Sequence, residues 1–204
     1  MKTTILFFLT ILSLVGCSKD SAGSKTDPIF QLPPETQTGA NTFGVTIREK
    51  VYIPRDRTGF NLGPSSKAMA LWASPGSNKW DELEVIDGAS AVGFQIIIHM
   101  QNLSTLKAGK YILEDSNFQN QIDSTPFNNI FFKIWDPSIS NYAYFGSIKN
   151  LGEINITRYD LPGRIVSGNF HGKFVRYDNP NEFITITDGR FDMNWFTAQT
   201  TVFP

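Results

Sequence analysis

The chain has 204 residues, of which 41% are hydrophobic and 13% aromatic, and its formal net charge is −1. This composition is typical of a folded globular protein and excludes a largely disordered one. A net charge near zero gives no electrostatic basis for binding nucleic acid. The chain holds one cysteine, so an intramolecular disulfide is excluded as well.

The first element in chain order is an apolar run from Ile5 to Val15, which follows the positive charge of Lys2. This arrangement is typical of an export signal, and the run is shorter than the ~20 residues that a membrane-spanning helix needs. It ends in Leu14-Val15-Gly16-Cys17, which resembles the lipobox of bacterial lipoprotein signal peptides. An ordinary secretory signal is the alternative, but the only cysteine lies at the lipobox position.

The resemblance implies that residues 1–16 are a signal peptide and that acyl chains, palmitate among them, are attached to Cys17. Two or three chains form a lasting anchor, because each buried CH₂ contributes about 0.8 kcal/mol. We therefore expect a lipoprotein of the cell envelope, held at the outer membrane by lipid on Cys17. Lys19-Asp20 only partly resembles the export signal of surface lipoproteins, so the periplasmic and surface faces both stay open.

A polar segment rich in Gly, Ser, Thr and Pro follows, and we interpret residues 17–42 as a tether. Its apolar island, Ile29, Phe30 and Leu32, is expected to dock on the domain or on a partner. Residues 43–204 are of a size that suits one β-rich domain.

Two short stretches resemble an O-glycosylation signal of Bacteroidetes. They are Asp20-Ser21-Ala22 and Asp123-Ser124-Thr125. The resemblance implies glycans on Ser21 and Ser124.

The domain opens with alternating apolar residues from Phe43 to Ile53, a pattern that predicts a hairpin. Arg48-Glu49 at its centre is poor chemistry for a type I′ turn, which needs φ > 0 at both positions. We therefore expect a loop longer than two residues, or a strained one. Lys67 to Ala73 is ambiguous between helix and strand, and strand is favoured by its length and flanking prolines. Ala91 to Met100 is apolar on both faces, which predicts a central strand.

Near the C-terminus, the apolar pattern of Glu182 to Phe196 changes phase at Asp188-Gly189. A β-bulge in one long strand and a tight Asp-Gly hairpin both explain the change. The bulge is favoured, because the preceding segment, Arg164 to Arg176, is then long enough to pair end to end. Either explanation leads us to expect φ > 0 at Gly189.

About nine or ten short strands with turn signals and no convincing helix predict an all-β, antiparallel fold. A two-sheet β-sandwich is the first choice, because the apolar pattern of Ala91 to Met100 predicts a central strand that is covered on both faces. A closed, lipocalin-like β-barrel is the alternative.

Four stretches of the chain resemble a family of Bacteroidetes lipoproteins that carries a domain of unknown function. These stretches are Leu32–Gly44, Gly152–Arg158, Ile165–Gly168 and Ile186–Asp192. The chain departs from the family pattern at Val45, where a cysteine is typical, and at Arg48-Glu49, where Asn-Gly is typical. The resemblance implies export and a β-rich fold. The family has no established activity, so no catalytic residue is implied.

Aromatic residues are the candidates for a binding surface. Trp80 follows a polar turn, and Tyr142 and Tyr144 share a strand face, so the three could form a platform for stacking sugars. Core or rim positions are the alternative for all three.

The sequence offers little for catalysis or metal binding. No nucleophile motif is present, and His99 and His171 are predicted to be separate residues on sheet faces rather than a shared site. Asp81-Glu82-x-Glu84 is expected at a solvated edge, and Asp178 to Glu182 has ordinary turn composition as well as oxygen ligands for Ca²⁺. We expect no metal, no cofactor and no enzymatic activity.

The sequence therefore predicts a lipid-anchored envelope protein that acts as a non-catalytic binding module for a ligand or glycan. An accessory or structural component of an envelope complex is the first alternative. A carboxylate-dependent hydrolase is the second.

Overall fold

In the computed structural model, the described residues are 30–57, 67–73, 80–119 and 127–204. Cys17, Ser21 and Ser124 lie outside the described residues, as does the predicted signal peptide.

Ten strands form a single antiparallel sheet in the described part of the chain. In chain order they are β1 (Thr42–Ile47), β2 (Lys50–Tyr52), β3 (Met69–Ala73), β4 (Trp80–Asp87), β5 (Phe94–Gln101), β6 (Gly109–Ile112), β7 (Asn129–Asp136), β8 (Asn141–Asp160), β9 (Ile165–Arg176) and β10 (Asn179–Asn194). A short helix α1 (Leu103–Leu106) and a 3₁₀ turn η1 (Thr197–Gln199) complete the fold. The hydrogen-bonded order is β2-β1-β10-β9-β8-β7-β5-β4-β3, with β6 paired to β8.

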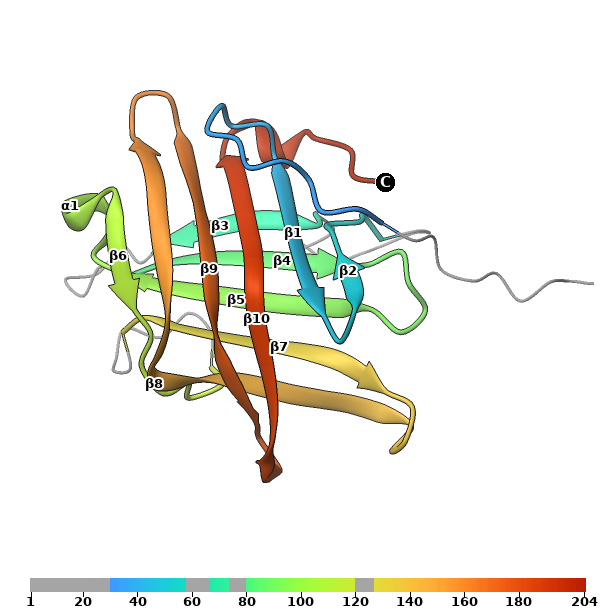
Figure 1. The fold of residues 1–204 in the computed structure, drawn as a ribbon. Helices are drawn as coiled ribbons and strands as arrows, with labels where there is room; N and C mark the ends of the chain where they lie inside the picture. Colours follow the sequence, from blue (N-terminus) through green and yellow to red (C-terminus); the bar gives the residue numbers. More distant parts are fainter. Residues whose placement is uncertain (1–29, 58–66, 74–79, 120–126) are drawn as a thin grey trace, which may run out of the picture.

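The sheet curls into a half-barrel, so that two sets of strands face each other across a core. In Figure 1, β6, β9, β10, β1 and β2 cross in front of β3, β4, β5 and β7. The long strand β8 joins the two sets: its first part pairs with β7 and its last part with β6. A register shift between Ser147 and Gly152 separates those parts, as expected where a strand bends. The predicted all-β antiparallel class is confirmed, and the curl is consistent with either the sandwich or the barrel.

Phenylalanine rings fill the space between the two sets of strands. Phe132 of β7 lies 5.5 Å from the ring of Phe145 and 5.3 Å from that of Phe174, measured between centroids. Such pairs contribute roughly 0.5–1.5 kcal/mol each beyond their buried area. The predicted central strand is confirmed as β5, which is buried on both faces, although it begins at Phe94 rather than Ala91. Lys67 to Ala73 also contains the predicted strand, β3.

The predicted bulge is present, but its expected backbone conformation is wrong. Strand β10 runs without interruption past Asp188-Gly189, with a register shift against β9 between Ile186 and Gly189. Gly189 is not among the described glycines with positive φ, which are Gly39 and Gly109. A glycine is required for a different reason: a Cβ at this position would lie 2.3 Å from the ring of Phe170. The close packing of that ring, and not a left-handed turn, excludes a side chain.

The sequence predicted either a longer loop or a strained one between the first two strands. The strained loop is present, with only two residues between β1 and β2. Ile47 pairs with Lys50, so only Arg48 and Glu49 form the turn, with φ of 49° and 67°. Left-handed backbone costs a residue with a side chain roughly 1–2 kcal/mol relative to glycine. Contacts of Arg48 offset part of this cost, because its guanidinium binds Glu182 and lies 5.5 Å above the centroid of Phe145.

Replacing Glu49 with glycine is therefore expected to stabilise the domain, by about 1 kcal/mol. Denaturant unfolding measures the change. The matched control is Lys50→Gly, one residue further on inside β2, which is expected to destabilise because glycine weakens a strand. Equal or lower stability of Glu49→Gly would show that the turn carries no strain.

The last part of the predicted tether packs on the domain. Gly44 leaves room for Pro33 and Leu32, since a Cβ on Gly44 would lie 2.4 Å from the Cδ of Pro33. Phe30 lies against Arg55, with 5.1 Å between its ring centroid and the guanidinium carbon. The apolar island therefore docks on the domain as far as it is described.

One carboxylate, Asp192 of β10, holds this segment in place. It accepts hydrogen bonds from the Thr36 hydroxyl at 2.6 Å and from the backbone N–H groups of Thr38, Gly39 and Ala40 at 2.9, 2.8 and 3.1 Å. The Ser167 hydroxyl of β9 donates a further bond at 2.6 Å. We call Asp192 with these five donor groups the Asp192 clasp. Burial alone would raise the pKa of Asp192, but the hydrogen bonds outweigh it and lower that pKa to about 2.

The four stretches that carry the family resemblance meet around this clasp. Arg190, near the end of the last stretch, donates to the carbonyl of Pro33 at 3.3 Å. Arg158, at the end of the second, donates to the carbonyl of Gln37. Asp188 accepts a bond from the backbone N–H of Thr46 at 3.2 Å. These stretches therefore have a structural role, which is to fasten the entering chain to the sheet.

Candidate functional site

A hollow formed by the described residues runs along β3. On one side of β3 lies β4, its hydrogen-bonded neighbour, and on the other lie the end of β10 and η1. Two cavities of about 260 and 270 Å³ share Leu71 and Trp195 as walls. We call the two together the β3 groove. Its other lining residues are Lys67, Met69, Ala70, Trp72, Ala73, Trp80, Asp81, Glu84, Ser104, Tyr159, Leu161, Met193 and Gln199.

The sequence places an apolar surface on both walls of the groove. Met69 and Leu71 alternate along β3, so they share a face, and Met69 is fully buried. On the opposite wall, the bulge in β10 brings Met193 and Trp195 to the inner side of the sheet. Trp195 stacks on Tyr159, with ring centroids 6.2 Å apart and an interplanar angle of 23°. Its position is fixed by a hydrogen bond from its backbone N–H to the carbonyl of Arg164 at 3.1 Å.

Asp81 is the titratable group that stands out in the groove. It lies near the start of β4 and precedes the buried Leu83 on the same strand face. Burial raises the pKa of Asp81 to about 6, and the nearby His99 opposes this shift. Burial and the Asp81 charge together raise the pKa of Tyr159, and they raise that of Tyr111 to about 12. The groove thus holds a carboxyl group that exchanges its proton close to neutral pH.

Asp81 makes the stability of the domain depend on pH. Its folded-state pKa of about 6 lies above the ordinary value of 3.8 for an aspartate, so the folded chain holds the proton more tightly. Stability is therefore expected to fall as the pH rises from about 4 to about 6. Asp81→Asn should raise the melting temperature at pH 7.5 and change it little at pH 4. A uniform shift at both pH values would show that the carboxyl is not perturbed.

The two glutamates of this strand face the opposite side of the sheet from Asp81. Glu82 is buried and lies 3.2 Å from Nδ1 of His99. Glu84 accepts hydrogen bonds from Gln95 at 2.7 Å and from the Trp72 indole at 3.2 Å. Side chains alternate along a strand, so both glutamates lie on the other face of β4 from Asp81, although Glu84 still lines the cavity at the edge strand β3.

The two histidines do not form a site together. His99 is buried on β5 and stacks on Trp80, with ring centroids 5.6 Å apart. His171 is exposed on β9, where it pairs with Glu153 of β8. Within the described residues, no group of three or more His, Cys, Asp or Glu side chains is arranged to hold a metal ion.

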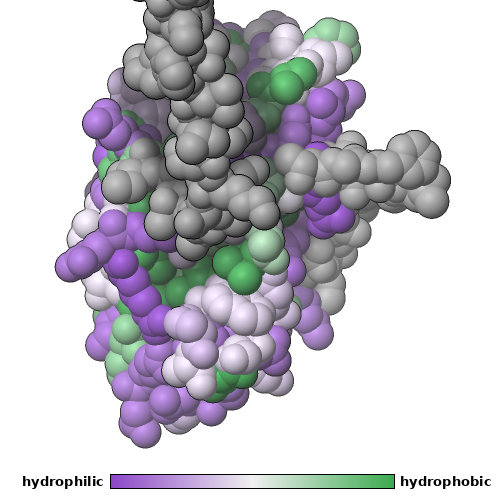
Figure 2. All heavy atoms as spheres, turned by 90° about the vertical axis from the view of Figure 1, so that its right-hand side faces the viewer, coloured by the Kyte–Doolittle hydropathy of each residue, from purple (hydrophilic) through white to green (hydrophobic). Residues whose placement is uncertain are grey.

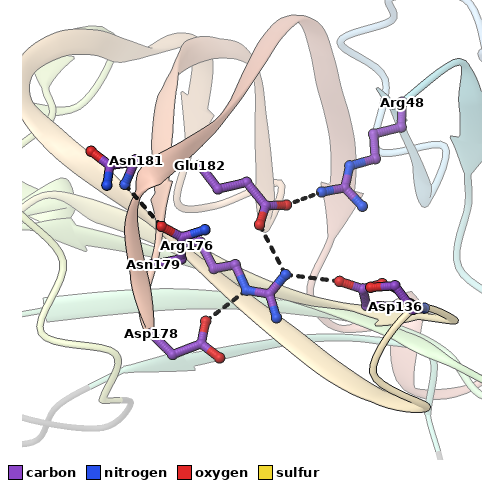
Figure 3. A network of polar contacts seen from close by, with 8 residues as sticks. Arg48, Asp136, Arg176, Asp178, Asn179, Asn181 and Glu182 are labelled. Atoms are coloured by element: carbon purple, nitrogen blue, oxygen red, sulfur yellow. Dashed lines mark hydrogen bonds and ion pairs between the residues drawn. The ribbon is translucent and has the colours of Figure 1, made fainter.

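The acidic segment from Asp178 to Glu182 is engaged by arginine, as Figure 3 shows. Arg176 binds Asp178 at 2.6 Å, Asp136 at 2.8 Å and Glu182 at 2.9 Å. Arg48 binds the other oxygen of Glu182. A hydrogen bond from Arg176 lowers the pKa of Asp178, and hydrogen bonds from Ser138 and then Arg176 lower that of Asp136. The oxygens that could have bound Ca²⁺ thus neutralise a guanidinium that joins β7, β9 and β10.

The three aromatic residues singled out from the sequence lie in two places. Trp80 is only 6% exposed and packs on His99 at the end of the sheet where β4 pairs with Gln101. Tyr142 and Tyr144 lie on β8, where Tyr144 is 42% exposed and Tyr142 meets Trp135 edge to face. The tyrosines are thus neighbours on one surface, and Trp80 belongs to the β3 groove.

Sequence reasoning missed the main walls of the groove, Leu71, Asp81, Tyr159 and Trp195. One signal was present, because the phase change at Gly189 places Trp195 on the same face as Met193. Nothing in the pattern shows that this face meets β3.

No family model matches the chain, and no curated protein sequence or solved structure matches it either. Among the described residues, no helix is both long and apolar enough to cross a membrane. The geometry of the groove therefore carries the functional argument alone.

Proposed function

We propose that this protein is a lipid-anchored, non-catalytic binding module of the cell envelope whose ligand occupies the β3 groove. The observation that carries the proposal is the pair of cavities that share Leu71 and Trp195. Binding sites for small molecules are concave and mostly apolar, with a few polar groups that fix orientation. The groove has this character, with Asp81 as a half-buried polar group.

The chemistry of the walls favours a ligand with an apolar face and hydroxyl groups, such as a sugar. The indole of Trp195, already stacked on Tyr159, offers a flat surface for the apolar face of a sugar ring. Asp81 lines the same cavity and can accept hydrogen bonds from hydroxyl groups when it is ionised.

The arrangement of carboxylates supports binding rather than hydrolysis. Glycoside hydrolysis generally needs two carboxyl groups that flank the substrate. Asp81 lines one cavity of the groove and Glu84 lines the other, but Glu84 lies on the opposite face of β4 and both of its oxygens accept hydrogen bonds. Glu82 is buried against His99. The proposal therefore assigns no catalytic residue.

Tryptophan fluorescence provides a direct test, because three of the four tryptophans, Trp72, Trp80 and Trp195, line the groove. A panel of soluble glycans and small amphiphiles is titrated against the protein, and a ligand that enters the groove changes the emission. Trp195→Ala is expected to weaken binding roughly fivefold or more, since one lost stacking contact costs about 1 kcal/mol beyond its buried area. Phe196→Ala, at the exposed neighbouring position, is the matched control and should leave binding unchanged.

Two outcomes would contradict the groove assignment. Binding that survives Trp195→Ala but is lost in Tyr144→Ala would place the ligand on the outer surface of β8. Turnover of a glycan, peptide or ester that Asp81→Asn abolishes would show that the protein is an enzyme.

The anchor is tested separately. Cells that express the chain are labelled with radioactive palmitate, and the wild type is expected to incorporate label. Cys17→Ser should incorporate none and should be released or remain as uncleaved precursor. Label that persists in this variant would exclude lipidation at Cys17, without bearing on the groove.

A further inference from the structure

The end of the domain that the tether enters is defined by a buried ion pair. Arg55, against which Phe30 packs, binds both oxygens of Asp87 at 2.7 Å, and both side chains are at most 8% exposed. Residues 18–29 separate Phe30 from Cys17, and a coil of that length spans about 20 Å. A lipid on Cys17 would therefore hold this end of the domain close to the membrane.

A polar cavity of about 190 Å³ opens at the same end. It lies at the turn between β4 and β5, and Arg57, Lys133 and Tyr142 contribute to its walls. Burial lowers the pKa of Lys133, and the positive charge of Arg57 lowers it further. The Lys133 ammonium lies 5.2 Å above the centroid of the Tyr142 ring. Two cations that repel each other across a cavity are stabilised when an anion lies between them.

The acidic groups near this cavity do not cancel the positive charge of its arginine and lysine side chains. Asp87 is bound to Arg55 on both oxygens. The charge of Glu84 raises the pKa of Lys133, but not enough to offset burial and Arg57, so this pKa stays below its ordinary value. Both oxygens of Glu84 also accept hydrogen bonds, from Trp72 and Gln95.

Exposed apolar side chains lie in two turns at this end of the domain. Val92, in the turn between β4 and β5, is 36% exposed, and Ile139, in the turn between β7 and β8, is 46% exposed. Figure 1 shows both turns projecting from the right-hand side of the domain, and Figure 2 views this side, where hydrophobic residues lie among hydrophilic ones. Cations with apolar residues at loop tips are the chemistry that suits a bilayer surface.

We propose that this end of the domain rests on the membrane, with Arg57 and Lys133 binding the phosphate groups of anionic lipids and Val92 and Ile139 touching the headgroup layer. The proposal rests on the proposed anchoring, which brings the surface within reach of the bilayer. It orients the domain so that the membrane covers the β4–β5 turn and leaves the β3 groove, along another edge of the sheet, open to solution.

The first experiment removes the lipid, so that its result does not depend on anchoring. The chain from residue 17 with Cys17→Ser is sedimented with phosphatidylcholine vesicles that contain about a third phosphatidylglycerol. Binding is expected there, and not with pure phosphatidylcholine. Arg57→Gln and Lys133→Gln should each weaken binding roughly fivefold, the effect of one basic residue at an anionic surface. Lys110→Gln is the control, an exposed lysine on β6 that should have no effect.

The second experiment reads the orientation in the lipidated protein. Because Cys17 is the only cysteine, single cysteines at Val92, Ile139 and Leu161 can each carry a nitroxide label. Collision with oxygen and with a water-soluble nickel complex then gives the depth of each label. Labels at 92 and 139 are expected in the headgroup layer, and the label at 161, beside the β3 groove, in water.

Three results would overturn the proposal. The first is that all three labels lie in water, and the second is that vesicle binding does not depend on Arg57 and Lys133. The third is that inorganic phosphate binds through Arg57 and Lys133 while vesicles do not, which would make the cavity a site for a free anion.

Discussion

Replacing Asp192 with alanine is expected to lower the free energy of unfolding by on the order of 3 kcal/mol. The substitution leaves three backbone N–H groups and two hydroxyl groups without their charged acceptor. Hydrogen bonds to a charged group are the stronger kind, and buried donors without an acceptor are costly. Denaturant unfolding gives the loss, and Asp115→Ala, at an exposed acceptor of a single backbone bond, is the control.

The same residue predicts how the domain behaves in acid. The pKa of Asp192 is about 2 in the folded chain, below the ordinary value of 3.8 for an aspartate. A lowered pKa contributes stability that is present above about pH 4 and is lost as the pH falls toward 2. Asp192→Asn should therefore flatten this part of the stability profile. Hydrogen exchange should also show residues 36–40 less protected in the variant. A profile as steep as that of the wild type would exclude Asp192 as the source.

The second large effect is expected at Arg176. Arg176→Met should lower the melting temperature sharply, because it leaves Asp136 buried without its cation and separates β7 from the β9–β10 hairpin. Arg176→Lys should recover only part of the loss, since an ammonium cannot reproduce the planar fork that meets three carboxylates.

The control for Arg176 is an exposed ion pair. Lys149 binds Glu114 at 2.7 Å, but the Lys149 side chain is 56% exposed. Exposed pairs contribute little, so Lys149→Met is expected to change the melting temperature only slightly. If both variants melted together, the buried network would not support the fold.

The strand pattern could be predicted because alternation depends on near neighbours in the chain. Phe94, Ile96 and Ile98 predicted a buried central strand, and β5 occupies that place. The bulge at Gly189 was predictable for the same reason. Its conformation was not, because it depends on the ring of Phe170 across the strand pair.

The candidate site depends on contacts that no local pattern contains. Leu71 and Trp195 face each other only because the sheet curls, and the pKa of Asp81 is raised by the burial that results. Likewise, the acidic turn from Asp178 to Glu182 resembled a loop that binds Ca²⁺. The cation it holds is Arg176, which in sequence looks like an ordinary strand residue.

The Asp192 clasp also determines how the domain bears force. Under the proposed anchoring, the chain is pulled whenever its ligand is fixed to something that moves. With the proposed anchor at Cys17, tension would first load the contacts of Phe30 and Pro33 and then residues 36–40, which supply four of the five donors of the clasp. Only then would it load β1, whose Thr42 pairs with Asp192. Because β1 lies between β2 and β10, a pull along it shears several ladder bonds together instead of opening them one at a time. If the chain is anchored as proposed, the clasp is expected to carry such a load before the strands that line the β3 groove.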